Sequence, residues 1–116
     1  MSSINPQDRR GSYRLRFPVR ERPRLLGEGM AWAVYDCSES GVRCLVPGDA
    51  AAPDIGATVE GTLRFSRGEE VPIVGVVVWA QPGHVGLTLD PRHAVPFRIL
   101  LAEQRHIHAT YPDFPL

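Results

Sequence analysis

Short segments of alternating apolar and polar residues make up most of the chain from residue 22 onward. Each segment predicts a β-strand, because successive side chains of a strand point to opposite faces, and turn residues such as Gly, Pro, Asp and Ser separate the segments. The connections are short enough for antiparallel neighbours. The six predicted strands span residues 22–28, 30–37, 41–46, 58–65, 71–79 and 84–90.

The period of the apolar residues changes after Asp90. Phe97, Leu100, Leu101 and Gln104 fall at helical spacing, and we expect a helix over about residues 94–106, with a proline tolerated in its first turn. Six antiparallel strands with one apolar face need either a second sheet or closure into a barrel. The pattern therefore predicts an all-β fold with one helix: a six-stranded antiparallel β-barrel plus a C-terminal α-helix across one opening.

The length of 116 residues fits one domain, and eleven Gly and eleven Pro favour turns over long helices. Residues 1–13 lack apolar periodicity, so we expect a flexible arm followed by a single domain over 14–116. The longest apolar stretch is too short for a membrane-spanning helix, and no signal-peptide pattern precedes it. We therefore expect a cytoplasmic protein with Cys37 and Cys44 as reduced, mostly structural thiols.

The thirteen basic residues are all Arg and balance thirteen acidic ones, so no overall positive field favours a nucleic-acid polymer. Seven of the arginines nevertheless lie within residues 9–24, with Glu21 as the only acid there. A guanidinium group offers two parallel hydrogen bonds and a flat face for stacking, which indicates a small, planar, anionic partner. Four of these arginines are expected to line one solvated strand face: Arg16, Arg20, Arg22 and Arg24.

Two local patterns stand out, Arg10-x-x-x-Arg14 in the arm and Asp36-x-Ser38-x-x-Gly41 between the second and third predicted strands. Either pattern alone is weak evidence. Two arginines four apart occur by chance in an Arg-rich segment, and the second pattern also describes a turn capped by its own side chains. Their joint presence in this order, before a strand-rich remainder, favours a binding site.

With these motifs the sequence resembles the PilZ domain family, whose members are receptors for the bacterial messenger cyclic di-GMP. The resemblance rests on "RRGSYR" (9–14), on "DCSESG" (36–41) followed by "VRCLV", and on "VVVWAQPGHVGLTLD" (76–90), which looks like the family's late hairpin. It covers most of the chain. It implies a six-stranded barrel, in agreement with the periodicity, and cyclic di-GMP as the ligand.

The residues of the two motifs suit that ligand chemically. Arg10 and Arg14 can donate to O6 and N7 of a guanine, stack on bases and pair with phosphates. Asp36 can accept from the N1 and N2 donors of the other guanine edge, and Ser38 can bond a phosphate or a base. Gly41 lets the ligand approach the backbone closely.

Two further residues complete the expected site. Trp79 could flank a guanine, although a Trp in an alternating strand more often belongs to the core, where we place Trp32. Arg9 directly precedes the first motif, and in the PilZ family an Arg there accompanies two mutually intercalated ligand molecules. We therefore expect two cyclic di-GMP molecules per chain, and an arm that becomes ordered on binding and presents a changed surface to an unidentified downstream protein.

Other functions have weaker support. The four histidines, which include the pair His106 and His108, show no ligand spacing for a metal, and no cofactor is indicated. Ser38 and Asp36 have no histidine placed to complete a catalytic triad, so we expect a receptor and not an enzyme. The alternatives are a protein adaptor on a PilZ-type barrel that binds no nucleotide and an arginine-arm nucleic-acid-binding module.

Overall fold

The computed structural model describes residues 13–48 and 52–115. Their main elements are seven strands and one α-helix, together with two short 3₁₀ helices, η1 (Val19–Glu21) and η2 (Pro91–His93). The strands and the α-helix are β2 (Leu15–Arg16), β3 (Arg24–Gly27), β4 (Met30–Cys37), β5 (Gly41–Leu45), β6 (Thr58–Arg64), β7 (Glu70–Gln81), β8 (His84–Leu89) and α2 (Phe97–Thr110).

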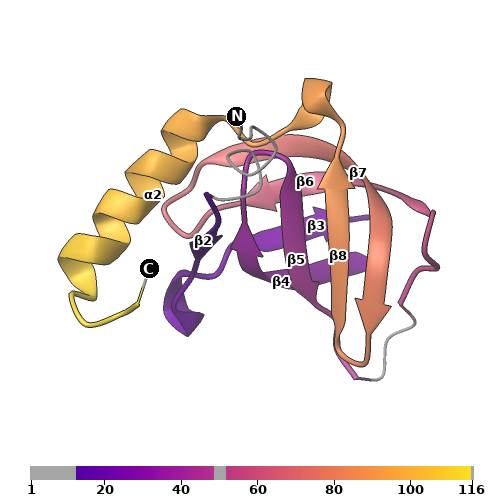
Figure 1. Ribbon diagram of the computed structural model, residues 1–116, viewed down its shortest axis with the longest axis horizontal. Helices are drawn as coiled ribbons and strands as arrows, with labels where there is room; N and C mark the ends of the chain where they lie inside the picture. The colour runs from indigo at the N-terminus through magenta and orange to yellow at the C-terminus, as the bar shows by residue number, and fades with distance from the viewer. Residues whose placement is uncertain (1–12, 49–51, 116) are drawn as a thin grey trace, which may run out of the picture.

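Six of the strands form a closed antiparallel barrel in the order β4-β3-β6-β7-β8-β5, and pairing between β4 and β5 completes the circle (Figure 1). The predicted six-stranded barrel with one C-terminal helix is thereby confirmed. The two-residue strand β2 adds to the outside of this ring by pairing with β4, at Leu15 opposite Cys37. The first arginine motif therefore ends beside the strand on which the second motif begins.

Alternating side chains fill the barrel, as β7 illustrates with Val71, Ile73 and Val77 all buried.

A two-residue turn reverses the chain between β7 and β8. Pro82 suits the second position of such a turn, and Gly83 adopts a φ of 82°, which only glycine reaches without strain. Trp32 is buried, as expected, and Cys37 and Cys44 lie in the core as free thiols.

Helix α2 begins later than predicted and continues further, over Phe97–Thr110. The residue before a proline avoids helical backbone, so Pro96 stands at the N-cap instead of in the first turn. The helix runs along one side of the barrel beside β2 (Figure 1) and buries Ile99, Leu100 and Ile107. It fixes that side of the barrel, which includes the segment that carries Arg14.

The four alternating arginines do not share one strand face. Arg16 lies on β2, Arg20 in η1, Arg22 directly after η1 and Arg24 on β3. Prolines at positions 18 and 23 flank η1 and interrupt the extended backbone that the alternation would need. The expectation of one continuous basic strand face was therefore wrong.

Candidate functional site

A pocket of about 510 Å³ opens on the outer surface of the barrel, over strands β5, β8 and β7. These strands lie side by side in Figure 1, with β8 between the other two. Among residues 13–48 and 52–115, those that line the pocket include two arginines and no acidic side chain. They are Arg14, Ser40, Gly41, Val42, Arg43, Val78, Trp79, Gly86, Leu87 and Thr88.

Asp36 lies beneath this pocket and is only 2% exposed. Its position depends on a bulge in β4: the pairing with β5 shifts register between Val34 and Asp36, which leaves Tyr35 as an extra residue. Trp32 and Val34 point into the barrel, so strict alternation would send residue 36 inward as well. Because of the bulge, Asp36 instead pairs with Arg43 on the outer face.

Two guanidinium groups share the carboxylate of Asp36. Arg14 Nη1 donates to Oδ1 at 2.7 Å, while Arg43 donates to Oδ2 from Nη2 at 2.5 Å and from Nε at 3.2 Å. The two arginine side chains remain 39% and 38% exposed. The buried carboxylate of Asp36 therefore holds two partly exposed guanidinium groups at the pocket, and the net charge of these three side chains is positive.

The turn that carries Ser38 and Gly41 brings the backbone close to Arg14. A Cβ atom on Gly41 would lie 3.0 Å from Arg14 Nη2, so glycine leaves room for the guanidinium group. Ser38 is buried, its Oγ accepts from the Ser40 N–H at 3.3 Å, and its own N–H donates to the Gly41 carbonyl at 2.8 Å. Ser38 thus stabilises the turn below the pocket and does not line it.

Trp79 faces the outside of the barrel because of a second bulge. The pairing of β7 with β8 shifts register between Val77, which is buried, and Trp79, which pairs with Gly86 on the outer face. The indole lies directly over Gly86, where a Cβ atom would stand 2.2 Å from its Nε1. Trp79 is therefore a wall of the pocket and not a core residue.

Four of the predicted site residues are thus gathered around one pocket: Arg14, Asp36, Gly41 and Trp79. Ser38 supports the same turn from below. Arg9 and Arg10, together with most of the predicted arm, lie outside the described residues. Tyr13 is described, and although it was assigned to the arm it is partly buried.

Arg43 is a site residue that the sequence reasoning missed. It lies in an otherwise apolar strand, between Val42 and Cys44, which both point into the barrel. Its guanidinium carbon lies over the ring of Tyr35, 4.6 Å from the centroid. The sequence does contain a pattern that could have identified Arg43. A charged residue between two apolar residues of a strand points to the outer face, and this strand directly follows the second motif.

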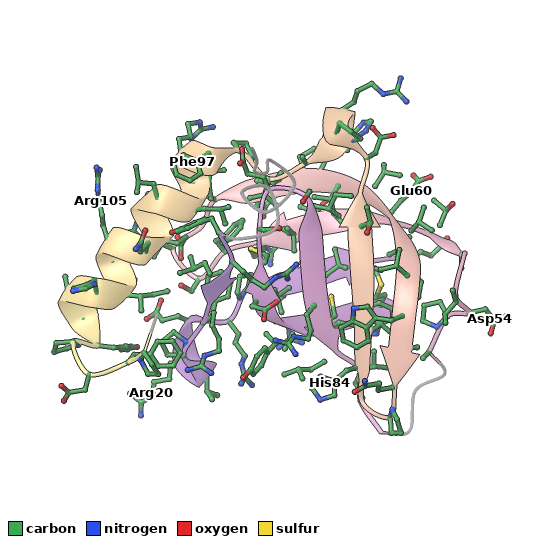
Figure 2. The ribbon with its side chains drawn as sticks, viewed as in Figure 1. Arg20, Asp54, Glu60, His84, Phe97 and Arg105 are labelled. Atoms are coloured by element: carbon green, nitrogen blue, oxygen red, sulfur yellow. The ribbon has the colours of Figure 1, made fainter. Side chains whose placement is uncertain are left out.

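The segment that carries Arg14 is tied to α2 on its other side. Tyr13 donates its hydroxyl to Gln104 Oε1 at 2.5 Å and packs edge-on against Phe97, with 5.5 Å between ring centroids. Figure 2 shows Phe97 at the start of α2. Further along, Glu21 Oε1 lies 3.1 Å from His106 Nε2. The site and the helix therefore share one connecting segment.

Several other kinds of site receive no support within residues 13–48 and 52–115. No three His, Cys, Asp or Glu side chains in these ranges gather as metal ligands would. Burial raises the pKa of both core thiols, that of Cys44 to about 12, so they are unsuited to act as nucleophiles. None of the helices in the described ranges has the length and apolar character needed to cross a membrane.

A protein-family model matches most of the chain. The family model described as PilZ domain matches residues 8–103, from before the described N-terminal residue to the middle of α2. No curated protein matches the chain. The matched span contains both motifs and all the residues around the pocket.

Proposed function

The chain belongs to the PilZ domain family, a family of cyclic di-GMP receptors, and we propose that it binds this dinucleotide in the pocket over β5, β8 and β7. One observation carries the proposal. The buried carboxylate of Asp36 holds the guanidinium groups of Arg14 and Arg43 at a pocket whose opposite wall is the indole of Trp79. Cations and planar groups together suit a ligand made of phosphates and purines.

Each residue has a role in this proposal. Arg14 donates to a guanine edge or a phosphate, and Trp79 flanks a base. Asp36 accepts from an arginine at each oxygen and so aims their donors, and Oδ1, which accepts from Arg14 alone, keeps acceptor capacity for a guanine. Gly41 keeps the space that Arg14 occupies. Ser38 serves the ligand through the turn that it stabilises.

Arg9 and Arg10 complete the proposed site from outside the described residues. We expect two intercalated cyclic di-GMP molecules per chain, because in the PilZ family an Arg at the position of Arg9 accompanies such a pair, and a third guanidinium group adds donors for its four guanines and four phosphates. Arg9 contacts the outer molecule in this arrangement. The expected signal is an ordering of the arm, which changes the surface that a downstream protein meets.

Isothermal titration calorimetry with cyclic di-GMP tests the proposal on the wild-type chain and on Arg14→Ala. Losing a charge-assisted hydrogen bond at a desolvated site costs about 2–5 kcal/mol, so the variant should bind about thirtyfold more weakly or worse. Arg64→Ala is the matched control, because Arg64 also pairs with one carboxylate, that of Glu70, but lies on β6 and not among the pocket residues. Circular dichroism verifies that each variant is folded.

The same titration separates the alternatives. A short single-stranded oligonucleotide in place of cyclic di-GMP tests the nucleic-acid module, and binding of neither ligand by the folded wild-type chain favours the adaptor. A ratio near one ligand per chain, at a verified active concentration, would argue against the intercalated pair. Arg9→Leu should shift a ratio of two toward one if Arg9 holds the outer molecule.

A further inference from the structure

Arg43 is a charged pocket residue that lies outside both sequence motifs. It stands two positions after Gly41 on β5, and the sheet pairs it with Asp36 on one side and with Gly86 on the other. Gly86 in turn pairs with Trp79. Four neighbouring strands, β4, β5, β8 and β7, therefore carry a row of outward-facing residues. In that order the row consists of a carboxylate, a guanidinium group, a glycine and an indole.

Gly86 lies between two residues with planar side chains. Strands in a sheet lie about 4.8 Å apart, so the backbones of Arg43 and Trp79 are roughly 10 Å apart across Gly86. Because Gly86 has no side chain, the indole of Trp79 lies over it and extends toward Arg43, and both planar residues line the pocket. The row thus flanks the pocket with a cation on one side and an aromatic ring on the other.

The guanidinium group of Arg43 has donors left for a ligand. Its Nε and Nη2 atoms donate to Asp36 Oδ2, and Tyr35 supports the group from one face. Its Nη1 atom has no hydrogen-bond acceptor among residues 13–48 and 52–115, and the side chain is 38% exposed. A guanidinium group that hydrogen bonds hold along one edge, and whose other edge is exposed, is preorganised to bind an anion.

The charge at the site favours the same role. Asp36 neutralises one of the two guanidinium groups, and none of the acidic residues in the described part of the chain lines the pocket to neutralise the second. Arg43 is not needed to neutralise Asp36, because Arg14 Nη1 already lies 2.7 Å from Asp36 Oδ1. The second arginine therefore supplies positive charge in excess of what the buried carboxylate requires.

We propose that Arg43 is a ligand-binding residue of this pocket, which donates from Nη1 to a phosphate oxygen of the bound dinucleotide while Asp36 and Tyr35 hold its guanidinium group in place. This inference rests on the proposed function and extends it to a residue outside both motifs. It makes the pocket a two-arginine phosphate site within the described residues, with Arg14 and Arg43 on either side of one buried carboxylate.

The test compares cyclic di-GMP binding by the wild type, Arg43→Ala, Arg43→Lys and the control Arg64→Ala in calorimetry. A hydrogen bond to a charged group contributes about 1.5–3 kcal/mol, so Arg43→Ala should weaken binding about 10- to 150-fold. Arg43→Lys keeps the charge without the planar fork and should lose less affinity than Arg43→Ala. Arg64→Ala should bind as the wild type does.

A second measurement reports on the surroundings of the guanidinium group of Arg43 when the ligand binds. In a ¹H–¹⁵N spectrum, the side-chain Nε–H signal of Arg43 is assigned by its absence from Arg43→Lys, and it should shift when cyclic di-GMP is added to the wild type. This readout also decides the matter if Arg43→Ala does not fold.

The outcomes separate the two proposals. If the wild type binds and Arg43→Ala binds equally well or more tightly, or if the Nε–H signal does not move, Arg43 is only a counter-ion of Asp36 and this inference is wrong. If the folded wild type binds no cyclic di-GMP, the proposed function fails, and the role of Arg43 fails with it.

Discussion

Gly86 offers a direct test of the way in which the barrel presents Trp79. A Cβ atom at position 86 would lie 2.2 Å from Nε1, 2.3 Å from Cε2 and 2.8 Å from Cδ1 of the indole. Contacts this short do not occur, so Gly86→Ala must displace the ring. Gly86 is not among the glycines with positive φ, so alanine suits the backbone and the indole alone has to move.

The size of the effect follows from the role of the ring. A base stacked on an aromatic side chain contributes about 1–3 kcal/mol, so a displaced indole should weaken cyclic di-GMP binding by about 5- to 150-fold. The fold should tolerate the change, because a side chain forced about 30° from its rotamer costs only about 0.5–1.5 kcal/mol. The loss of affinity should therefore appear in a protein that still unfolds cooperatively.

Calorimetry and tryptophan fluorescence measure the two consequences separately. Trp32 is only 7% exposed and should emit as before, so a red shift in Gly86→Ala reports the movement of Trp79. Gly48→Ala is the matched control, since a Cβ atom there meets nothing within 4 Å. Unchanged emission together with wild-type affinity in Gly86→Ala would refute both the position of the indole and its part in binding.

Two further predictions concern the stability of the barrel and its thiols. Burial alone would raise the pKa of Glu21, but hydrogen bonds from Ser66, Tyr111 and His106 outweigh it and lower the pKa. The stabilisation from these bonds is therefore present above the ordinary glutamate pKa and is lost as the pH falls through the depressed value. In urea unfolding, Glu21→Gln should lower the free energy of unfolding by about 1–3 kcal/mol at pH 7 and by much less near pH 3. Glu60 is exposed, so the control Glu60→Gln should leave the free energy of unfolding unchanged at either pH. Cys37 and Cys44 should not react with Ellman's reagent in the native protein and should both react in guanidinium chloride, because burial raises the pKa of each thiol; rapid native labelling would contradict their place in the core.

The barrel was predictable because apolar and polar residues alternate along most of its strands and turn residues separate them. The prediction was less accurate at the start of α2, where helical spacing extended the helix back to residue 94. Pro96 restricts Val95 to extended backbone, which outweighs the apolar periodicity at that end. At the other end the helix continues to Thr110, because the Tyr111 N–H still donates to the Ile107 carbonyl.

The candidate site was predictable in its motif residues and not in its geometry. Arg14 and Asp36 could be identified as a pair from their types and order, and the structure places them 2.7 Å apart. The outward direction of Asp36 and Trp79 depends on bulges, at Tyr35 in β4 and at Val78 in β7. A bulge is set by pairing with another strand, which the local pattern of one strand does not contain.

Arg14 stands between two anchors, and this limits how the proposed ligand can act. Leu15 is buried in the core on one side, and Tyr13 is held by Gln104 and Phe97 of α2 on the other. A ligand that binds Arg14 where it stands leaves the contact with α2 intact and signals through the new surface that the ligand and the ordered arm present. A ligand that draws the backbone of Arg14 away breaks the Tyr13 hydrogen bond and ring contact, at a cost of about 1–3 kcal/mol that is subtracted from its affinity. The second case releases the start of α2, so the same free energy that weakens binding would carry the signal to the helix.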